Sequence, residues 1–247
     1  MPLDWDAHTY SRVGGGVTAL GHEVLERTEL RGDETVLDAG CGSGELTAEL
    51  ATRVPRGKVF AVDGSPRMVE LARSRLQHDI GVRPLCRIWC SDLLELEVPE
   101  PVDLVFSAAT FHWIADHERL FERLHAALRP GGRLVAQCGG AGNIAAIRRA
   151  IEEVSGDPWM PWNFATPEET EARLRSAGFA QARAWLYDRP VAPGEPLAFL
   201  ETVILGEHLQ RLEEDEREPF ARSVLERLGT PFVAHYVRLN IEATVGA

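Results

Sequence analysis

The chain has 247 residues, of which 45% are apolar, 26% charged and 7% aromatic. This composition suits a folded domain with a sizeable core and excludes a disordered or fibrous chain. Acidic residues outnumber Lys and Arg by 38 to 26, which gives a formal charge of −12. Because an acidic surface repels phosphate backbones and anionic lipid heads, we expect no nucleic-acid partner and no membrane partner.

The four cysteines, at positions 41, 86, 90 and 138, show no CxxC pair and no His at zinc-finger spacing. We therefore expect no disulfide framework and no metal site, and a cytoplasmic location is expected. Residues 1–10 lack the apolar stretch of a signal peptide, and no segment reaches the length of a membrane span. The oligomeric state stays open.

Apolar strands and amphipathic helices alternate in the first half of the chain. Three helices are predicted there. One covers 45–53, one begins at Ser65-Pro66, and one begins at its cap Asp116 and ends before Pro130. Strands that are apolar on both faces and alternate with helices predict a parallel sheet covered on each side. The five predicted strands are residues 35–39, 58–62, 84–89, 102–107 and 133–137.

The second half is less regular. Helices are predicted at 143–154, from the Thr166 capping box to Gly178, and over much of 190–230. Alternating residues predict a half-exposed strand at 180–187 and a strand at 236–245 that closes the sheet. We expect a single domain over 1–247, with a core of 30–138, 166–189 and 234–247 and with cap segments of 1–25, 140–165 and 190–230.

The sharpest motif is VLDAGCGSG at residues 36–44, where the first strand turns into a helix. Its glycines let the backbone turn tightly and approach a ligand, and the helix N-terminus favours an anionic group. The spacing is GxGxG, whereas a dinucleotide fingerprint needs GxGxxG, and here Glu45 occupies the third position. Asp38 would face a pyrophosphate unfavourably, but it suits a ligand with an ammonium group.

Two further acidic residues follow predicted strands. Asp63 comes after the second strand, where a carboxylate accepts two hydrogen bonds from a ribose diol. Nicotinamide-binding folds share this feature, so it does not discriminate by itself. Asp92 follows the third strand and suits an adenine amino group, although a loop acid or a helix cap explains it equally well.

Together these motifs resemble the class I methyltransferases that use S-adenosylmethionine. The matching stretches follow the family's order: 37–44, 62–68, 91–93, 103–107 and 128–133. The resemblance implies an α/β fold, a Rossmann-like seven-stranded, mostly parallel sheet with helices on both faces, an antiparallel last strand and helical cap insertions. It also implies a cofactor site made of Tyr10, Asp38, Ala39, Gly40, Cys41, Gly42, Gly44, Asp63, Gly64, Ser65, Met68, Ser91, Asp92, Leu93, Ser107 and Ala108.

A narrower resemblance, to the trans-aconitate 2-methyltransferase branch, rests on residues 4–10, residues 111–116 and Gln137. It implies that Trp5 and Tyr10 close over cofactor and substrate, although they could instead pin a terminal segment to the core. The chain departs from this branch on the substrate side. Ser107 and His112 stand where the branch has Asn and Gln, and residues 138–143 replace a Met-Pro turn. The acceptor therefore stays open.

Candidate acceptor residues follow the fourth and fifth predicted strands. His112 lies five residues past Ser107, over the expected site of methyl transfer. It could act as a catalytic base, hold the acceptor by a hydrogen bond, or serve a structural role. Trp113 would contact the substrate beside it, and Arg148 or Arg149 would pair with an acceptor carboxylate. The aromatic residues at 159, 162 and 164 either rim the pocket or pack the cap.

The expected function is methyl transfer from S-adenosylmethionine to a small molecule, with O-methylation of a carboxylic acid as one form. Two alternatives stay open. A nicotinamide-dependent oxidoreductase is disfavoured by the GxGxG spacing and by the lack of a Tyr-x-x-x-Lys pair. A non-catalytic protein that binds S-adenosylmethionine is compatible with every motif.

Overall fold

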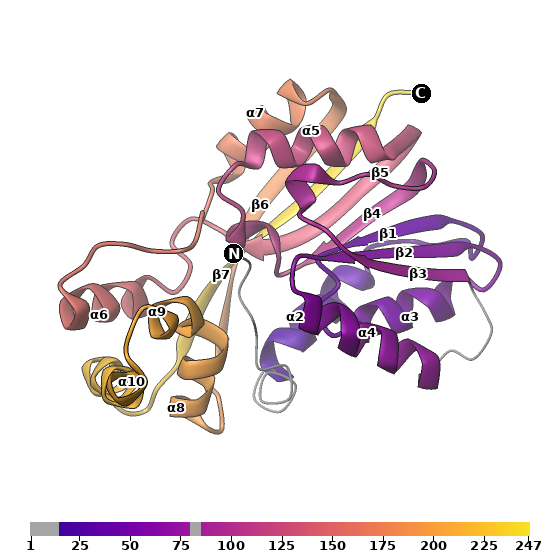
Figure 1. The fold of residues 1–247 in the computed structure, drawn as a ribbon. Coiled ribbons are helices and arrows are strands. Elements are labelled where there is room, and N and C mark those ends of the chain that lie inside the picture. The colour runs from indigo at the N-terminus through magenta and orange to yellow at the C-terminus, as the bar shows by residue number, and fades with distance from the viewer. Residues whose placement is uncertain (1–14, 80–84) are drawn as a thin grey trace.

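The computed structural model describes residues 15–79 and 85–247. One sheet of seven strands organises the chain, in the order β3-β2-β1-β4-β5-β7-β6 (Figure 1). The first five strands run parallel, and β7 lies antiparallel between β5 and β6. The strands are β1 (Thr35–Ala39), β2 (Lys58–Asp63), β3 (Leu85–Cys90), β4 (Val102–Ala108), β5 (Leu128–Gly139), β6 (Phe179–Val191) and β7 (Ala234–Val245). The predicted sheet, with its antiparallel last strand, is confirmed.

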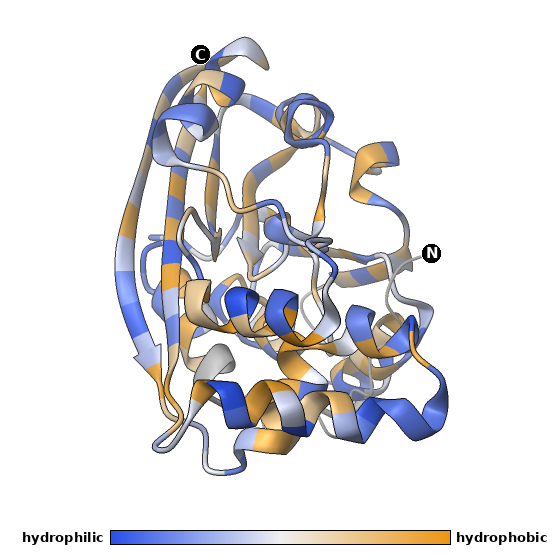
Figure 2. Cartoon of the chain, turned by 90° about the vertical axis from the view of Figure 1, so that its left-hand side faces the viewer, coloured by the Kyte–Doolittle hydropathy of each residue, from blue (hydrophilic) through white to orange (hydrophobic). Residues whose placement is uncertain are grey.

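The antiparallel pair is longer than predicted, and its order differs. Strand β6 continues to Val191 rather than ending at Tyr187, because its pairing with β7 extends to the register pair Val191 and Ala234. Pro190 is tolerated there because β6 is the edge strand. The last strand therefore does not close the sheet at its edge. Figure 2 shows the hydrophilic and hydrophobic residues alternating along these two strands.

Helices cover both faces of the sheet, as predicted (Figure 1). On one face, Val24 and Leu50 pack with Leu104 in a shared apolar cluster. On the other face, Leu124 and Leu174 belong to the larger cluster of strand residues. The first face carries α2 (Gly15–Leu25), α3 (Glu45–Arg53) and α4 (Pro66–Asp79), and the second carries α5 (His117–Ala127) and α7 (Pro167–Ser176).

A second group of helices forms beside the sheet. It shares an apolar cluster that includes Ile147, Phe199 and Val224, and it also draws in Tyr236 of β7. We call it the helical group: α6 (Ala145–Ser155), α8 (Pro196–Phe199), the π-helical turn η3 (Leu200–Ile204), α9 (Gly206–Gln210) and α10 (Glu214–Leu228). The expected division into core and cap segments stays a prediction, and part of its first cap segment lies outside the described residues.

Local signals explain where the helices begin. Asp116 accepts a hydrogen bond from the Arg119 N–H and caps α5, and Thr166 forms the predicted capping box of α7. Helix α6 begins at Ala145 rather than 143, because Ile144 adopts a left-handed conformation with φ 45°. Two short 3-10 helices, η1 (Leu93–Glu95) and η2 (Phe111–Trp113), follow β3 and β4.

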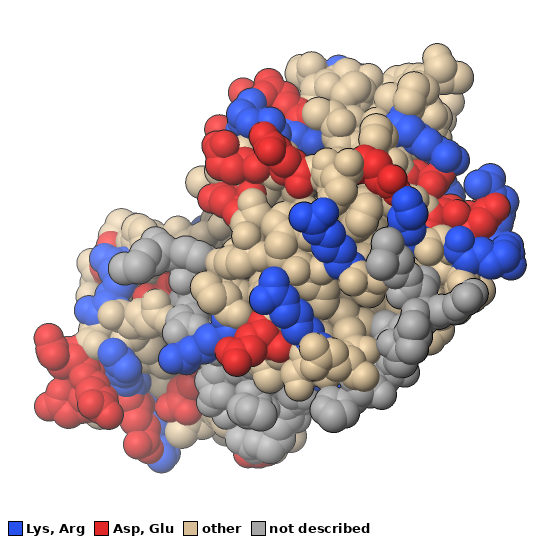
Figure 3. Space-filling model, turned by 45° about the vertical axis from the view of Figure 1, so that its right-hand side comes forward, with Lys and Arg blue, Asp and Glu red and all other residues tan. Residues whose placement is uncertain are grey.

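Charged side chains of both signs are interspersed on the face drawn in Figure 3. In the described part of the chain, no helix combines the length and the apolar character that crossing a membrane requires. The same residues contain no group of three or more His, Cys, Asp and Glu side chains suited to a metal ion.

Candidate functional site

A cavity of about 660 Å³ opens at the carboxyl ends of the parallel strands, between the sheet and the helical group. Its lining divides into two parts. The glycine half comes from the segments 40–43, 63–68 and 91–94, which follow β1, β2 and β3. The aromatic half comes from the segments 108–115, 143–144, 162–164, 203–207 and 236–238. A crevice beyond the carboxyl ends of the strands is where sheets of this kind bind ligands.

The turn after β1 shapes the glycine half. Gly40 and Gly42 have φ of 88° and 52°, a left-handed region that favours glycine. A Cβ on Gly40 would lie 2.1 Å from Thr110 Oγ1, so this glycine lets the turn pack against the end of β4. A Cβ on Gly42 would meet nothing within 4 Å. The space in front of Gly42 is therefore open to a ligand that approaches the backbone.

Asp63 presents its carboxylate to the glycine half from the end of β2. Its two oxygens accept hydrogen bonds from the Gly42 N–H at 2.9 Å and the Ser65 N–H at 2.8 Å. Burial raises the pKa of Asp63, and the two hydrogen bonds oppose that shift. Each carboxylate oxygen retains a second lone pair, which suits a ligand with two neighbouring hydroxyl groups.

The rest of the glycine half provides apolar and polar contacts together. Met68 and Leu93 are buried and line the cavity, as do Gly64, Ser65 and Ser91. Asp92 also lines the cavity, while its Oδ1 accepts from the Leu94 N–H at 2.9 Å and caps η1. The structural interpretation of Asp92 as a helix cap therefore holds, and it leaves a ligand role possible through the other carboxylate oxygen.

Five predicted cofactor residues lie near the cavity without forming its lining: Asp38, Ala39, Cys41, Gly44 and Ser107. Asp38 lies beneath the glycine turn and accepts from Thr47 Oγ1 at 2.6 Å. Burial raises the pKa of this carboxyl to about 7. Ser107 Oγ donates to the Ala39 carbonyl at 2.6 Å and ties β4 to β1. Their ligand roles stay predictions, and Trp5 and Tyr10 lie outside the described residues.

His112 lies on η2 and is buried at the wall of the aromatic half. Its Nδ1 accepts a hydrogen bond from the Gly139 N–H at 3.3 Å. Burial lowers the pKa of His112 well below its ordinary value, and the positive charge of Arg238 and the nearby His117 add to the effect. The imidazole is therefore neutral, and with Nδ1 as acceptor its proton resides on Nε2. The cap of α5 is Asp116, not His112.

Aromatic rings surround His112. The ring centroids of Trp113 and Phe164 lie 5.2 Å and 5.8 Å from that of His112. Trp162 stacks on Phe164 with centroids 5.7 Å apart, and both line the cavity. Trp159 is exposed instead, and the Arg211 guanidinium lies over its ring. Two of the three loop aromatics thus form the pocket wall, while the third lies on the surface.

The two arginines expected to pair with an acceptor do not line the cavity. Helix α6 directs Ile147 and Ile151 into the apolar cluster of the helical group, which leaves Arg149 exposed. The Arg148 guanidinium lies 5.7 Å from the Phe164 ring centroid, outside the cavity lining. A substrate role for either arginine stays a prediction without a contact in the cavity wall.

Sequence reasoning missed a different cation, Arg238 of β7. This side chain is 2% exposed, lines the aromatic half, and donates from Nε to Gln137 Oε1 at 3.1 Å. The alternation in 236–245 assigned Arg238 to a polar face, and nothing local indicated that the face would be buried. Asn143 and Ile144 were also missed as lining residues; Ile144, like Ala109, has a positive φ for a non-glycine residue.

The sequence profile of the methyltransferase domain family matches residues 36–132. Trans-aconitate 2-methyltransferase of Paracidovorax citrulli is 33% identical over 177 residues, which cover 72% of this chain and 65% of that protein. An uncharacterized methyltransferase of Schizosaccharomyces pombe is 32% identical, with 72% of each chain covered. Trans-aconitate 2-methyltransferase of Rhizobium etli is 29% identical over 240 residues, covering 92% of this chain and 90% of that protein.

Solved structures show the same fold. A phosphoethanolamine N-methyltransferase of Haemonchus contortus in complex with S-adenosyl-L-methionine superposes with a TM-score of 0.68 at 20% identity, covering 98% of this chain and 57% of that chain. The YcgJ protein of Bacillus subtilis superposes with a TM-score of 0.66 at 17% identity, covering 93% and 99%.

Proposed function

This chain belongs to the S-adenosylmethionine-dependent methyltransferases, and on that premise we propose that it transfers a methyl group to a small molecule. One observation carries the proposal: the glycine half and the aromatic half form one continuous cavity. A cofactor held at Asp63 and Gly42 would thus face the aromatic half of the same cavity. The whole cavity has a volume of about 660 Å³, which suits a cofactor together with a compact acceptor rather than a folded macromolecule.

The residues of the glycine half fit this cofactor. Asp63 would accept from the ribose hydroxyls, Met68 and Leu93 would pack on the adenine, and the open face of Gly42 would admit the ligand backbone. When bound, S-adenosylmethionine supplies a methyl group on a positively charged sulfur that leaves readily. The protein's own contribution is to align the acceptor and to exclude water, which the aromatic walls of Trp113, Trp162 and Phe164 support.

The finer proposal is O-methylation of a small carboxylic acid. It is supported by the relatives named trans-aconitate 2-methyltransferase and by the cationic side chain in the aromatic half. We also propose a cytoplasmic location, in line with four free cysteines, and no nucleic-acid partner, in line with the net charge of −12. Because the alignment spans 65% of the Paracidovorax protein, that protein's activity supports the proposal but does not define it.

The test is an acceptor screen with mass spectrometry of the products. The purified protein is incubated with S-adenosylmethionine and with trans-aconitate, other small carboxylic acids, amines and phenols. Formation of S-adenosylhomocysteine with a methyl ester of a carboxylic acid is expected. Methylation of proteins or nucleic acids alone would contradict the proposal.

Two outcomes of further assays would favour the alternatives. Calorimetric binding of a nicotinamide cofactor, without binding of S-adenosylmethionine, would indicate an oxidoreductase. Binding of S-adenosylmethionine without turnover of any acceptor would indicate a non-catalytic binding protein.

A further inference from the structure

Arg238 brings a buried positive charge to the aromatic half. Arg238 lies on β7 and is paired in register with Gly139, the last residue of β5. The face of the sheet that carries Arg238 also carries Gln137 and Asn240. Arg27, in the turn that follows α2, joins the same polar layer through a hydrogen bond to Asn240. Burying a guanidinium costs free energy, because the charge loses its hydration, unless hydrogen bonds or opposite charges compensate.

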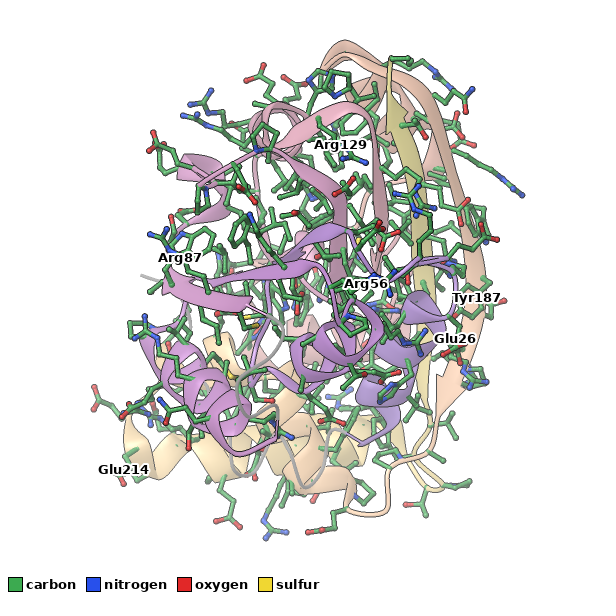
Figure 4. All side chains as sticks on the ribbon, turned by 90° about the vertical axis from the view of Figure 1, so that its right-hand side faces the viewer. Glu26, Arg56, Arg87, Arg129, Tyr187 and Glu214 are labelled. Atoms are coloured by element: carbon green, nitrogen blue, oxygen red, sulfur yellow. The ribbon has the colours of Figure 1, made fainter. Side chains whose placement is uncertain are left out.

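A chain of hydrogen bonds fixes the orientation of this guanidinium. Arg238 Nε donates to Gln137 Oε1 at 3.1 Å, and Gln137 Nε2 donates to Tyr187 Oη at 3.2 Å. The Tyr187 hydroxyl donates in turn to Glu23 Oε2 of α2 at 2.5 Å. Figure 4 shows Tyr187 on the edge strand beside this helix. Since Gln137 must accept with its oxygen and donate with its nitrogen, its amide has one orientation, and so has the Arg238 Nε it binds.

His112 offers a hydrogen-bond donor to the same compartment. The backbone N–H of Gly139, the residue paired with Arg238, donates to His112 Nδ1 at 3.3 Å. A neutral imidazole that accepts at Nδ1 carries its proton on Nε2. His112 is therefore in the tautomer that gives a proton to a hydrogen bond, which is the opposite of what a general base needs.

Asn143 adds a further donor beside Gly139. Its Oδ1 accepts from the Val237 N–H at 2.9 Å, so the amide orientation places Nδ2 away from that contact. Gly139 makes room for this arrangement. A Cβ on Gly139 would lie 2.8 Å from Asn143 Nδ2 and 2.6 Å from the Phe164 ring. Three groups around one glycine thus present donors and a positive charge at the end of β5.

We infer that the guanidinium of Arg238 binds a carboxylate of the acceptor, with His112 Nε2–H as a second donor, and that methyl transfer here uses no general base. The inference rests on the proposed function and names its substrate class. An ionised carboxylate oxygen forms the bond to the methyl carbon while the carbon–sulfur bond breaks and its electron pair stays on sulfur. The carboxylate and sulfonium charges cancel, and no proton moves.

Glu207 of α9 is the alternative candidate for the contact with the acceptor. It lines the aromatic half, and burial raises the pKa of its carboxyl. A carboxylate there would suit an amine acceptor and could take up the amine's proton. Arg238 differs in being 2% exposed and held by Gln137, whereas Glu207 is partly exposed. We therefore assign the acceptor contact to Arg238.

Binding of matched charged and neutral ligands tests the assignment directly. The protein saturated with S-adenosylhomocysteine is titrated by calorimetry with trans-aconitate, with fumarate and with fumaramide, the uncharged analogue of fumarate. Wild type should bind a carboxylate in clear preference to fumaramide. Arg238→Gln should weaken carboxylate binding about 10- to 100-fold, the range of a charged hydrogen-bonded contact, and change fumaramide binding less than about twofold. The carboxylate affinity of Arg238→Lys should lie between those of wild type and Arg238→Gln, because lysine keeps the charge and loses the Nε donor.

Matched controls separate the assignment from misfolding and from failure of the proposed function. Arg183→Gln changes an exposed arginine of β6 and should bind all three ligands like wild type. Retained affinity for S-adenosylhomocysteine shows that Arg238→Gln is folded. If wild type binds neither carboxylate, or if Arg238→Gln keeps the preference, the assignment is wrong. Carboxylate binding that depends on Arg238, without methyl transfer to any small molecule, would instead contradict the proposed function and keep only the contact between Arg238 and the carboxylate.

Nuclear magnetic resonance of the ¹⁵N-labelled imidazoles tests the second donor without any acceptor. His112 should show the Nε2–H tautomer and should stay neutral as the pH is lowered through 6.5, the ordinary pKa of histidine, because burial, Arg238 and His117 all oppose a second proton. An Nδ1–H tautomer, or titration near the ordinary pKa of histidine, would overturn its role as a donor.

Discussion

The two halves of the cavity are built from different kinds of contact. The glycine half uses short segments that directly follow β1, β2 and β3, and Asp63 is held by backbone N–H groups of two neighbouring turns. The aromatic half uses segments from β4 to β7, and hydrogen bonds between distant elements orient its polar side chains. The bonds from Gly139 to His112 and from Arg238 to Gln137 each join residues that are far apart in the sequence.

This difference teaches that the glycine half is built from the turns after neighbouring parallel strands, whereas the aromatic half also depends on the antiparallel strands and the helical group. Changes in the glycine half should therefore alter cofactor binding and leave acceptor binding unchanged. Changes in the aromatic half should do the reverse. Each of the following variants tests whether the two halves act separately.

The largest effect is expected for Gly40→Ala. Its Cβ would lie 2.1 Å from Thr110 Oγ1, and its φ of 88° is unfavourable for alanine, so the turn must move. Binding of S-adenosylmethionine should weaken more than about 100-fold, since backbone strain of about 1–3 kcal/mol adds to the steric clash. Calorimetry measures the loss.

Gly131→Ala is the matched control for this variant. Gly131 has a similar φ of 73°, but a Cβ there would meet nothing within 4 Å. It should lower thermal stability slightly and leave cofactor affinity unchanged. Equal cofactor affinity in both variants would show that the turn tolerates displacement.

The next effect is expected for Asp63→Ala, which removes the carboxylate that we propose for the ribose. Affinity for S-adenosylmethionine should fall about 10- to 100-fold, as for the loss of charged hydrogen bonds. Affinity for a carboxylate acceptor should change less than about twofold. Unchanged cofactor affinity would show that Asp63 serves only the Gly42 and Ser65 N–H groups.

Asp38→Asn should change how stability depends on pH. The pKa of Asp38 is about 7 in the folded protein, above its ordinary value of 3.8, so the folded state holds a proton that the unfolded chain releases. This contribution to stability is complete at low pH and is lost as pH rises through 7. Between about pH 5 and 7, wild type should lose up to about 1.4 kcal/mol per pH unit relative to the variant. Urea unfolding of both proteins measures this slope, and parallel curves would contradict the pKa of Asp38.

His112→Gln should have a milder effect, because the amide can still donate a hydrogen bond. If His112 only positions the acceptor, kcat should fall less than about tenfold, since base catalysis is worth about 10²–10⁴-fold. The KM of the acceptor should rise, while cofactor affinity stays unchanged. A drop of a hundredfold or more in kcat, with a matching loss of wild-type activity at acid pH, would assign a base to the aromatic half.

Arg149→Gln should have the smallest effect. Arg149 is exposed on α6 and does not line the cavity, so the acceptor KM should stay within about twofold of wild type. Steady-state kinetics with the acceptor found in the screen provides the measurement. If the KM rises as much as it does in Arg238→Gln, the acceptor's carboxylate lies near α6. The acceptor site then extends beyond the aromatic half.

The glycine half could be predicted from the sequence because its signals are local. The glycine spacing after a buried strand, the acid after the next strand and the Ser-Pro helix start each depend on neighbouring residues. Since the carboxyl ends of parallel strands meet at one edge of the sheet, Gly42, Asp63 and Asp92 had to come together. Which of the motif residues reach the cavity was not readable in this way. Asp38 and Ser107 lie beside the lining because their side chains are engaged by Thr47 and by the Ala39 carbonyl.

The aromatic half was decided by the tertiary structure. The strands 180–187 and 236–245 were recognised by their alternation, but alternation does not say which strand takes the edge or what covers a polar face. Because β7 inserts between β5 and β6 and places Arg238 beside Gly139, an ordinary polar position of a strand becomes a buried cation in the cavity. Arg148 and Arg149 carry the same charge but do not line the cavity, so their substrate role stays a prediction. Sequence periodicity fixes which residues share a face, whereas only the packing of distant elements decides what that face meets.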